Sequence, residues 1–76
     1  MRIRREKKGR GGKEVTVISG LGLDTATLKE LAKQLKTTCS TGGSVKDSTI
    51  ELQGDKTTQA QAALEKQGYK VKRAGG

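Results

Sequence analysis

Residues 13–36, KEVTVISGLGLDTATLKELAKQLK, change their hydrophobic period within one short stretch, and this change decides the fold. The first part, KEVTVIS (13–19), is rich in β-branched residues and predicts a strand. After a glycine-rich connector, apolar residues recur at the i, i+3, i+4, i+7 spacing of one buried helical stripe. These residues are Leu28, Leu31, Ala32 and Leu35.

The predicted helix is capped by Asp24 or Thr25 and is expected to run to about Lys36. Three lysines repeat at a similar spacing on a neighbouring flank, so one side of the helix is expected to be cationic: Lys29, Lys33 and Lys36. Exposed helix faces often carry lysine, so the residues alone leave open an RNA contact and an ordinary solvated surface.

The segment before this strand predicts a β-hairpin with a basic tip. Residues 2–5 alternate loosely and are expected to form a short strand, whereas KKGRGG (7–12) breaks regular structure. Glycines remove side-chain restraint, and like charges hold the segment open. We therefore expect a flexible basic loop at about residues 6–12.

The second half of the chain predicts another pair of strands, a helix and a last strand. Asp47-Ser48 is expected to form the turn of the second hairpin, Asp55 to cap the second helix, and Gly68 to end it. The predicted elements are strands at 44–46 and 49–53, a helix at 56–67 and a strand at 69–73.

The resulting order, β-β-α-β-β-α-β, predicts an α+β fold built as a two-layer sandwich over residues 1–76, as a single domain. Each helix has one apolar side, so both are expected to pack on one face of a mostly antiparallel sheet of four to five strands. Alternating residues such as Ile50 and Glu51 leave the other face for solvent or a partner.

Positive charge is concentrated at the start of the chain, whose net charge is +8. Such a placement points to a polyanion, although a solvated tail is the plainer interpretation. A membrane partner is not expected, because Ile3 is the only apolar anchor in the segment. The cations in the first thirteen positions are Arg2, Arg4, Arg5, Lys7, Lys8, Arg10 and Lys13.

Residues for catalysis or metal binding are scarce. The chain has no His and a single cysteine, Cys39, so neither an activated nucleophile nor a zinc site can be assembled in the usual way. We expect no enzyme activity, no metal, no cofactor and no small-molecule substrate. Cys39 is expected to be a small buried hydrophobic residue, with a reactive thiol as the alternative. A single cysteine cannot form an internal disulfide, so we expect a reducing compartment such as the cytoplasm.

Aromatic residues are almost absent, which constrains how RNA could be bound. Single-strand readers stack bases on aromatic rings, and Tyr69 is the only ring here and is expected to fill the core. We therefore expect contacts with the backbone and the shape of a folded RNA.

Four segments together resemble the eukaryotic-type translation initiation factor one family (the SUI domain), and the shorter prokaryotic members are most similar. The segments are KKGRGGKEVTVISGL (7–21), LKELAKQLKTTCSTGGSVKD (28–47), TIELQGD (49–55) and GYKVKRAGG (68–76). The most specific pieces are TGGSVKD (41–47), IELQGD (50–55) and AGG (74–76), in this order and at this spacing. The resemblance implies a non-enzymatic factor that binds small ribosomal subunit RNA near the P site and influences start-codon and initiator-tRNA selection.

The resemblance also implies which residues face the RNA, and it makes initiator tRNA and other initiation factors candidate neighbours of a monomeric protein. The first group of contacts lies in the basic hairpin and the second on the first helix. The expected contacts are Arg4, Arg5, Lys7, Lys8, Gly9, Arg10, Gly11, Gly12 and Lys13, with Lys29, Lys33 and Lys36.

Two alternative functions remain open from the sequence. The first is a general RNA- or DNA-binding protein that acts away from the ribosome. The second is a ubiquitin-like modifier, because the chain ends in Gly75-Gly76 and begins as a hairpin followed by a helix.

Overall fold

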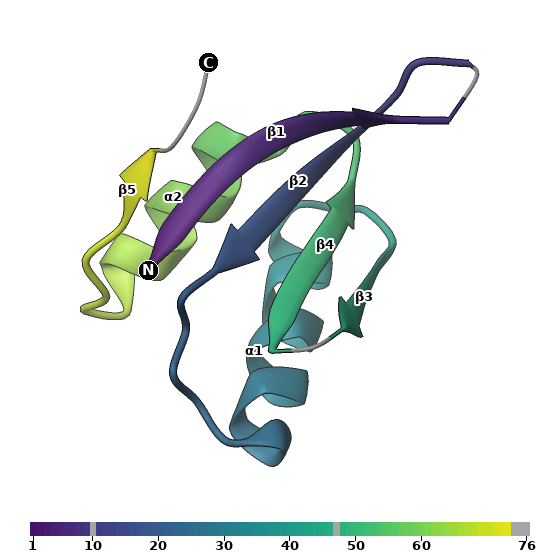
Figure 1. Cartoon of the computed structure of the whole chain (residues 1–76). Coiled ribbons are helices and arrows are strands. Elements are labelled where there is room, and N and C mark those ends of the chain that lie inside the picture. The colour runs from purple at the N-terminus through teal and green to yellow at the C-terminus, as the bar shows by residue number, and fades with distance from the viewer. Residues whose placement is uncertain (10, 47, 74–76) are drawn as a thin grey trace.

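The computed structural model describes residues 1–9, 11–46 and 48–73, and within them the elements follow the predicted order (Figure 1). The strands and helices are β1 (Arg2–Lys8), β2 (Lys13–Ser19), α1 (Thr25–Thr38), β3 (Gly43–Lys46), β4 (Thr49–Gln53), α2 (Thr57–Lys66) and β5 (Lys72–Arg73).

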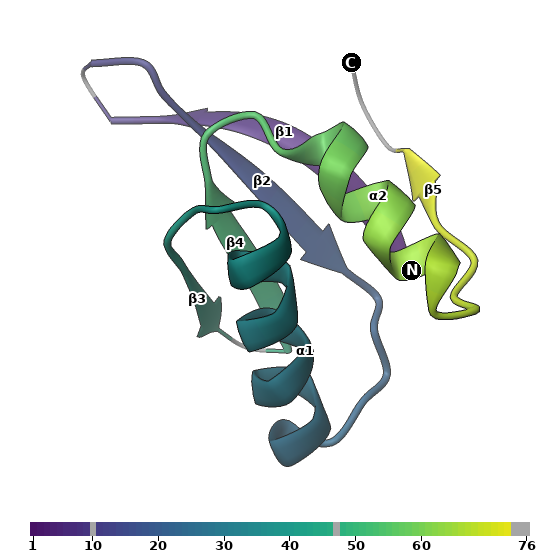
Figure 2. The same ribbon diagram turned by 180° about the vertical axis from the view of Figure 1, so that it is seen from behind.

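The strands form one sheet in the order β3-β4-β2-β1-β5, and both helices cover the same face of it (Figures 1 and 2). Every neighbouring pair is antiparallel except β1 and β5, which run parallel. The predicted α+β two-layer sandwich is confirmed, with a mixed sheet of five strands in the described part of the chain.

The core lies between the helices and the helix-covered face of the sheet. The period-two pattern of the strands turns Ile3, Ile18, Ile50 and Leu52 toward the helices, and all four are completely buried. The four apolar residues predicted for the first helix are its buried residues. Tyr69 is half-buried and packs against this core, as expected, and Cys39 is a buried free thiol within it.

Helix α1 begins as predicted and ends two residues later than Lys36. Asp24 is its N-cap, and the Thr27 N–H donates to Asp24 Oδ2 over 3.4 Å. Hydrogen bonding from Thr27 lowers the pKa of Asp24 from its ordinary value, because a carboxylate that accepts hydrogen bonds is stabilised in its charged form.

Helix α2 begins differently from the prediction that Asp55 caps it. The N-cap is Lys56, without a side-chain cap, because Thr57 engages the Asp55 carboxylate from within the helix: Thr57 Oγ1 donates to Asp55 Oδ1 over 2.9 Å. The helix ends close to the predicted position, where Gly68 has a φ of +95° and its N–H donates to the Glu65 carbonyl.

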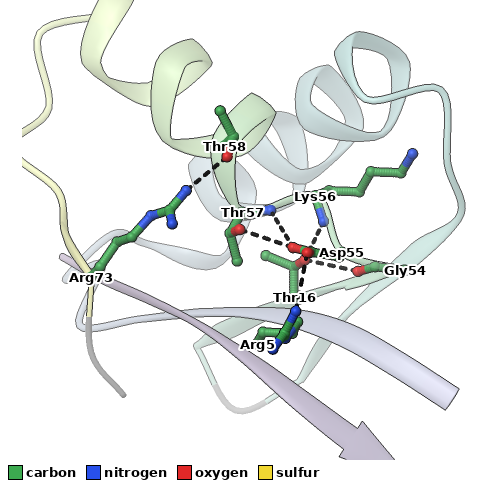
Figure 3. A network of polar contacts seen from close by, with 8 residues as sticks. All are labelled: Arg5, Thr16, Gly54, Asp55, Lys56, Thr57, Thr58 and Arg73. Carbon is green, nitrogen blue, oxygen red and sulfur yellow. Dashed lines mark hydrogen bonds and ion pairs between the residues drawn. The ribbon is translucent and has the colours of Figure 1, made fainter. Parts of the chain in front are cut away.

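A buried threonine joins the sheet to α2 (Figure 3). The Thr16 hydroxyl on β2 donates to the Gly54 carbonyl over 2.9 Å and accepts from the Lys56 N–H over 2.8 Å. Thr16 is completely buried, so both polar groups of its hydroxyl are satisfied away from water. This junction holds the start of α2 against β2.

Three strand boundaries differ from the predictions. β1 continues to Lys8, because its hydrogen-bonded ladder with β2 extends past the core and needs no apolar side chains there. β5 is limited to Lys72–Arg73, since Tyr69 and Val71 pack on the core before the chain joins β1. β3 begins at Gly43, one residue early, and Asp47 of the expected turn lies outside the described residues.

Candidate nucleic-acid interface

The β1–β2 hairpin extends beyond the rest of the sheet (Figures 1 and 2). β1 and β2 pair from Arg2↔Ser19 to Lys8↔Lys13, but β4 accompanies β2 only from Val15 to Ile18. On the other side, β5 pairs with β1 only at its first two residues. Residues 7–14 therefore form a two-stranded projection, called the tip below.

Glycines close the tip. Gly9 and Gly12 have φ values of +78° and +65°, a left-handed region that costs other residues about 1–2 kcal/mol. The Gly12 N–H donates to the Gly9 carbonyl over 3.3 Å. Gly9, Gly11 and Gly12 are all exposed, so the backbone of the turn is open to a partner. Arg10 and the side chain of Lys8 lie outside the described residues.

Two lysines supply the described positive charge of the tip, which also contains Glu14. Lys7 and Lys13 are exposed, and neither forms an ion pair with any residue that the structure describes. Strand alternation places Lys7 on the same face as Ile3, and Lys13 on the opposite, open face. The tip thus carries a lysine on each face of one narrow ribbon, with Glu14 opposite Lys7 on the same face.

The two arginines nearer the body have acidic partners within the protein. Arg4 pairs with Glu6 at 2.8 Å, and Arg5 pairs with Asp55 at 3.3 Å (Figure 3). Both pairs are exposed to solvent, so they are weak and can exchange with other anions. The charges of Arg4 and Arg5 are therefore partly neutralised within the protein, unlike those of Lys7 and Lys13.

The lysines of α1 form a separate surface. Lys29 and Lys33 are exposed and Lys36 is half-buried. Lys33 lines a hollow together with Glu30 and Gln34 of the same helix and Gln67 after α2. The helix packs on β3, β4 and α2 and does not belong to the projection. The C-terminal end of α1 leads into β3, and the first residue of β3 pairs with Leu52 near the end of β4. The next residue of β4 pairs with Val15 beside the tip, so Lys36 is the lysine of α1 that lies nearest to the tip.

The open face of the sheet carries further cations that the sequence analysis did not assign. They share this face by strand alternation with Arg4 and Lys13, and a period-two count along each strand could have found them. Val17 is buried there between its register partners Arg4 and Glu51. The additional cations are Arg2, Lys46 and Lys72.

Other kinds of site find little support among the described residues. They contain no group of three His, Cys, Asp or Glu side chains that could hold a metal ion. Burial raises the pKa of the Cys39 thiol, which favours its uncharged, unreactive form. None of the helices within these ranges combines the length and the apolar character needed to cross a bilayer.

These features define a small, basic α+β domain whose β1–β2 hairpin carries exposed cations at its tip. The chain belongs to the family described as Translation initiation factor SUI1, whose family model matches residues 1–70. The resemblance found in the sequence is thereby confirmed. This membership decides against the ubiquitin-like alternative, whose Gly75-Gly76 end lies outside the described residues.

Relatives in bacteria and archaea support the assignment. YciH of Escherichia coli (strain K12) is 51% identical over 76 residues, which cover the whole of this chain and 70% of the relative. The Protein translation factor SUI1 homolog of Ignicoccus hospitalis is 49% identical over 69 residues, covering 91% of this chain and 65% of the relative. The homolog of the same name in Methanocaldococcus jannaschii is 50% identical over 62 residues, covering 82% and 60%.

Proposed function

We propose that this chain binds RNA of the small ribosomal subunit near the P site, without catalysing a reaction, and influences the choice of start codon and initiator tRNA. Membership in a family of translation initiation factors supports a role in translation initiation. The observation that carries the RNA contact is the projecting tip, on which Lys7 and Lys13 have no acidic partner among the described residues.

The physical basis of the contact is phosphate neutralisation. Each lysine that meets a phosphate releases condensed counterions, so binding strengthens as the salt concentration falls. A narrow ribbon closed by glycines can enter a groove that a helix would not fit. The lysines of α1, of which Lys36 lies nearest to the tip, add a second group of contacts.

Selection follows from competition for space in this proposal. The tip occupies a position that a fully accommodated initiator tRNA also needs. Correct codon–anticodon pairing stabilises accommodation enough to displace the tip, whereas a mismatched complex does not. The contacts must then be of moderate strength, which suits a few exposed lysines better than a deep apolar interface.

The first test compares a tip variant with a charge-matched control. Lys7→Gln combined with Lys13→Gln removes two cations from the tip. Lys66→Gln combined with Lys70→Gln removes two exposed cations near β5, at the far end of the sheet. We expect the tip variant to bind isolated small subunits at least about tenfold more weakly, with a salt slope smaller by roughly 2, while the control binds like the parent protein.

Equal losses in both variants would show that net charge alone governs binding and would contradict the tip assignment. Equal affinity of the parent protein for small subunits and for duplex DNA would favour the alternative of a general nucleic-acid-binding protein. Sedimentation at moderate salt measures both quantities.

A second test addresses selection itself. In a reconstituted initiation reaction, the parent protein is expected to lower complex formation at a near-cognate codon more than at AUG, and the tip variant is expected to lose this difference. An unchanged codon ratio with the parent protein would contradict the proposed role, even if binding is confirmed.

A further inference from the structure

Three cations lie at the base of the open face of the sheet, at the end remote from the tip. Arg2 of β1 is the register partner of Lys72 in β5 and of Ser19 in β2. Lys46 of β3 pairs with Thr49 at the start of β4, which runs beside the end of β2. The three cations, called the basal row below, therefore follow one line across the strands, from β5 to β3.

The neighbours of these cations show which face the basal row occupies. Ile3 is completely buried beneath the helices, Val45 packs on the core, and Arg73 donates to two side chains of α2. Each of these three residues is adjacent in sequence to one cation of the basal row. Because side chains alternate along a strand, the whole row lies on the face turned away from the helices, which stand behind the sheet in Figure 1.

The basal row has no acid of its own among the residues that the structure describes. Its three cations are exposed, and none of them forms an ion pair within the described ranges. The described acids of the open face, Glu6 and Glu51, lie in rows nearer to the tip. Arg2 and Lys72 stand directly opposite each other on adjacent strands, where like charges destabilise a sheet. An anion bound between them relieves this repulsion.

The surroundings of the row favour a phosphate-bearing partner over a protein or a lipid surface. Protein interfaces are anchored by apolar and aromatic side chains, and binding to a bilayer surface needs apolar residues that insert. The described part of the chain exposes no large hydrophobic residue, and Val17 on this face is only 4% exposed. Phosphate contacts need cations and hydroxyl groups instead. The row contains such a hydroxyl, because Ser19 beside Arg2 has no side-chain partner among the described residues.

We propose that the basal row binds the phosphodiester backbone of one RNA strand, which crosses the sheet from β5 to β3. Adjacent strands are about 4.8 Å apart, so Arg2 and Lys72 can meet the same phosphate. Lys46 is three strand spacings from Arg2, about 14 Å, and meets a later phosphate of the same RNA strand. The row offers no ring for base stacking, so the contact is independent of base sequence.

The basal row and the tip are two separate contacts on one domain. Arg2 lies five positions before Lys7 in β1, which is about 17 Å along an extended strand. This inference rests on the proposed function for the source of the RNA, which is then a second segment of the small subunit. Two linked contacts raise the effective concentration of each at its own site. Displacement of the tip would then leave the protein attached through the basal row.

The chemistry of the row is tested on the isolated protein with a labelled dodecauridylate, by fluorescence anisotropy at several salt concentrations. Lys46→Gln combined with Lys72→Gln removes a cation from each end of the row. Lys56→Gln combined with Lys66→Gln removes two lysines beside and within α2, in the helix layer. We expect the row variant to bind at least about threefold more weakly, with a salt slope smaller by about 1.4, and the control to lose less than half as much.

The class of partner is tested with a glutamate peptide of the same length as the oligonucleotide and with vesicles that contain anionic lipid. We expect the parent protein to bind the dodecauridylate about tenfold more tightly than the peptide and not to sediment with the vesicles. In two-dimensional NMR, the oligonucleotide should shift the amides of Ser19, Lys46 and Lys72. The same spectra report whether each variant keeps the parent fold.

Equal losses in the row variant and the control, or unshifted amides along the row, would overturn the proposed surface. Equal affinity for the glutamate peptide, or binding to the vesicles, would overturn the assigned partner. If the tip variant still loses subunit binding in these cases, the proposed function stands without the basal row. If the row variant weakens oligonucleotide binding but the tip variant binds small subunits like the parent protein, the row stands and the proposed function fails.

Discussion

β1 and β2 pair along their whole length, but the two ends of this hairpin differ in burial and in charge. At the base, Ile3 and Ile18 are completely buried beneath the helices, and Thr16 ties β2 to the start of α2. At the tip, Lys7 and Lys13 are exposed on a ribbon beside which no third strand pairs in the described part of the chain. One pair of strands thus belongs to the core at one end and is exposed to solvent at the other.

Stability and binding are expected to depend on opposite ends of this hairpin. The base is held by burial and by satisfied polar groups, whereas the tip is held by backbone hydrogen bonds and turn geometry alone. Changes at the base should therefore alter unfolding, and changes at the tip should alter binding.

Ile18→Ala should be the most damaging change, lowering the free energy of unfolding by about 2–5 kcal/mol. Ile18 is completely buried among the core residues of both helices, so truncation leaves a cavity in a small core. Urea denaturation followed by circular dichroism measures the loss. Ile18→Val, which should cost about 0.5–1.5 kcal/mol, gives a value if the alanine variant is unfolded. A loss below that of the valine variant would contradict the assignment of the core.

Thr16→Val should lower the free energy of unfolding by about 1–3 kcal/mol, because it keeps the shape of the side chain but leaves the Lys56 N–H and the Gly54 carbonyl without their partner. Thr38→Val at the exposed end of α1 is a control of the same chemistry, because the Thr38 hydroxyl makes no hydrogen bond to another described residue. The same denaturation experiment compares them, and equal values for the two variants would show that the junction adds nothing.

Asp55 should make the free energy of unfolding depend on pH. Hydrogen bonding from Thr57, together with Arg5, lowers the pKa of Asp55 below its ordinary value of 3.8. A lowered pKa in the folded state means that this contribution is present above the unfolded value and is lost as the pH falls through the folded value. Asp55→Asn should therefore lose less stability than the parent protein between about pH 6 and pH 2.5. Parallel acid titrations of the two proteins would contradict this.

Lys7→Gln with Lys13→Gln should change the free energy of unfolding least, by no more than about 0.5 kcal/mol in either direction. Neither lysine has an acidic partner in the described part of the chain, and both lie outside the core. The same variant that weakens subunit binding should thus unfold like the parent protein. A destabilisation comparable to that of Thr16→Val would show that the tip belongs to the scaffold.

Local patterns sufficed for much of the fold. The stripe from Leu28 to Leu35 predicted α1 and its buried residues, and Asp24 was one of two caps proposed. The start of α2 was predicted one residue early, because the partners of Asp55 are not apparent from the capping pattern. Arg5 lies fifty positions away from Asp55 in the chain, and no local pattern could have paired them.

The candidate interface was likewise predicted only in part. The order of the elements, the placement of the cations and the glycines of the turn were all set by the sequence, because periodicity and turn chemistry act over a few neighbouring residues. Which cations lack an acidic partner among the described residues was decided only by the tertiary structure. Ion pairing and enclosure depend on distances between segments remote in sequence, and these distances exist only once the sheet and helices have packed.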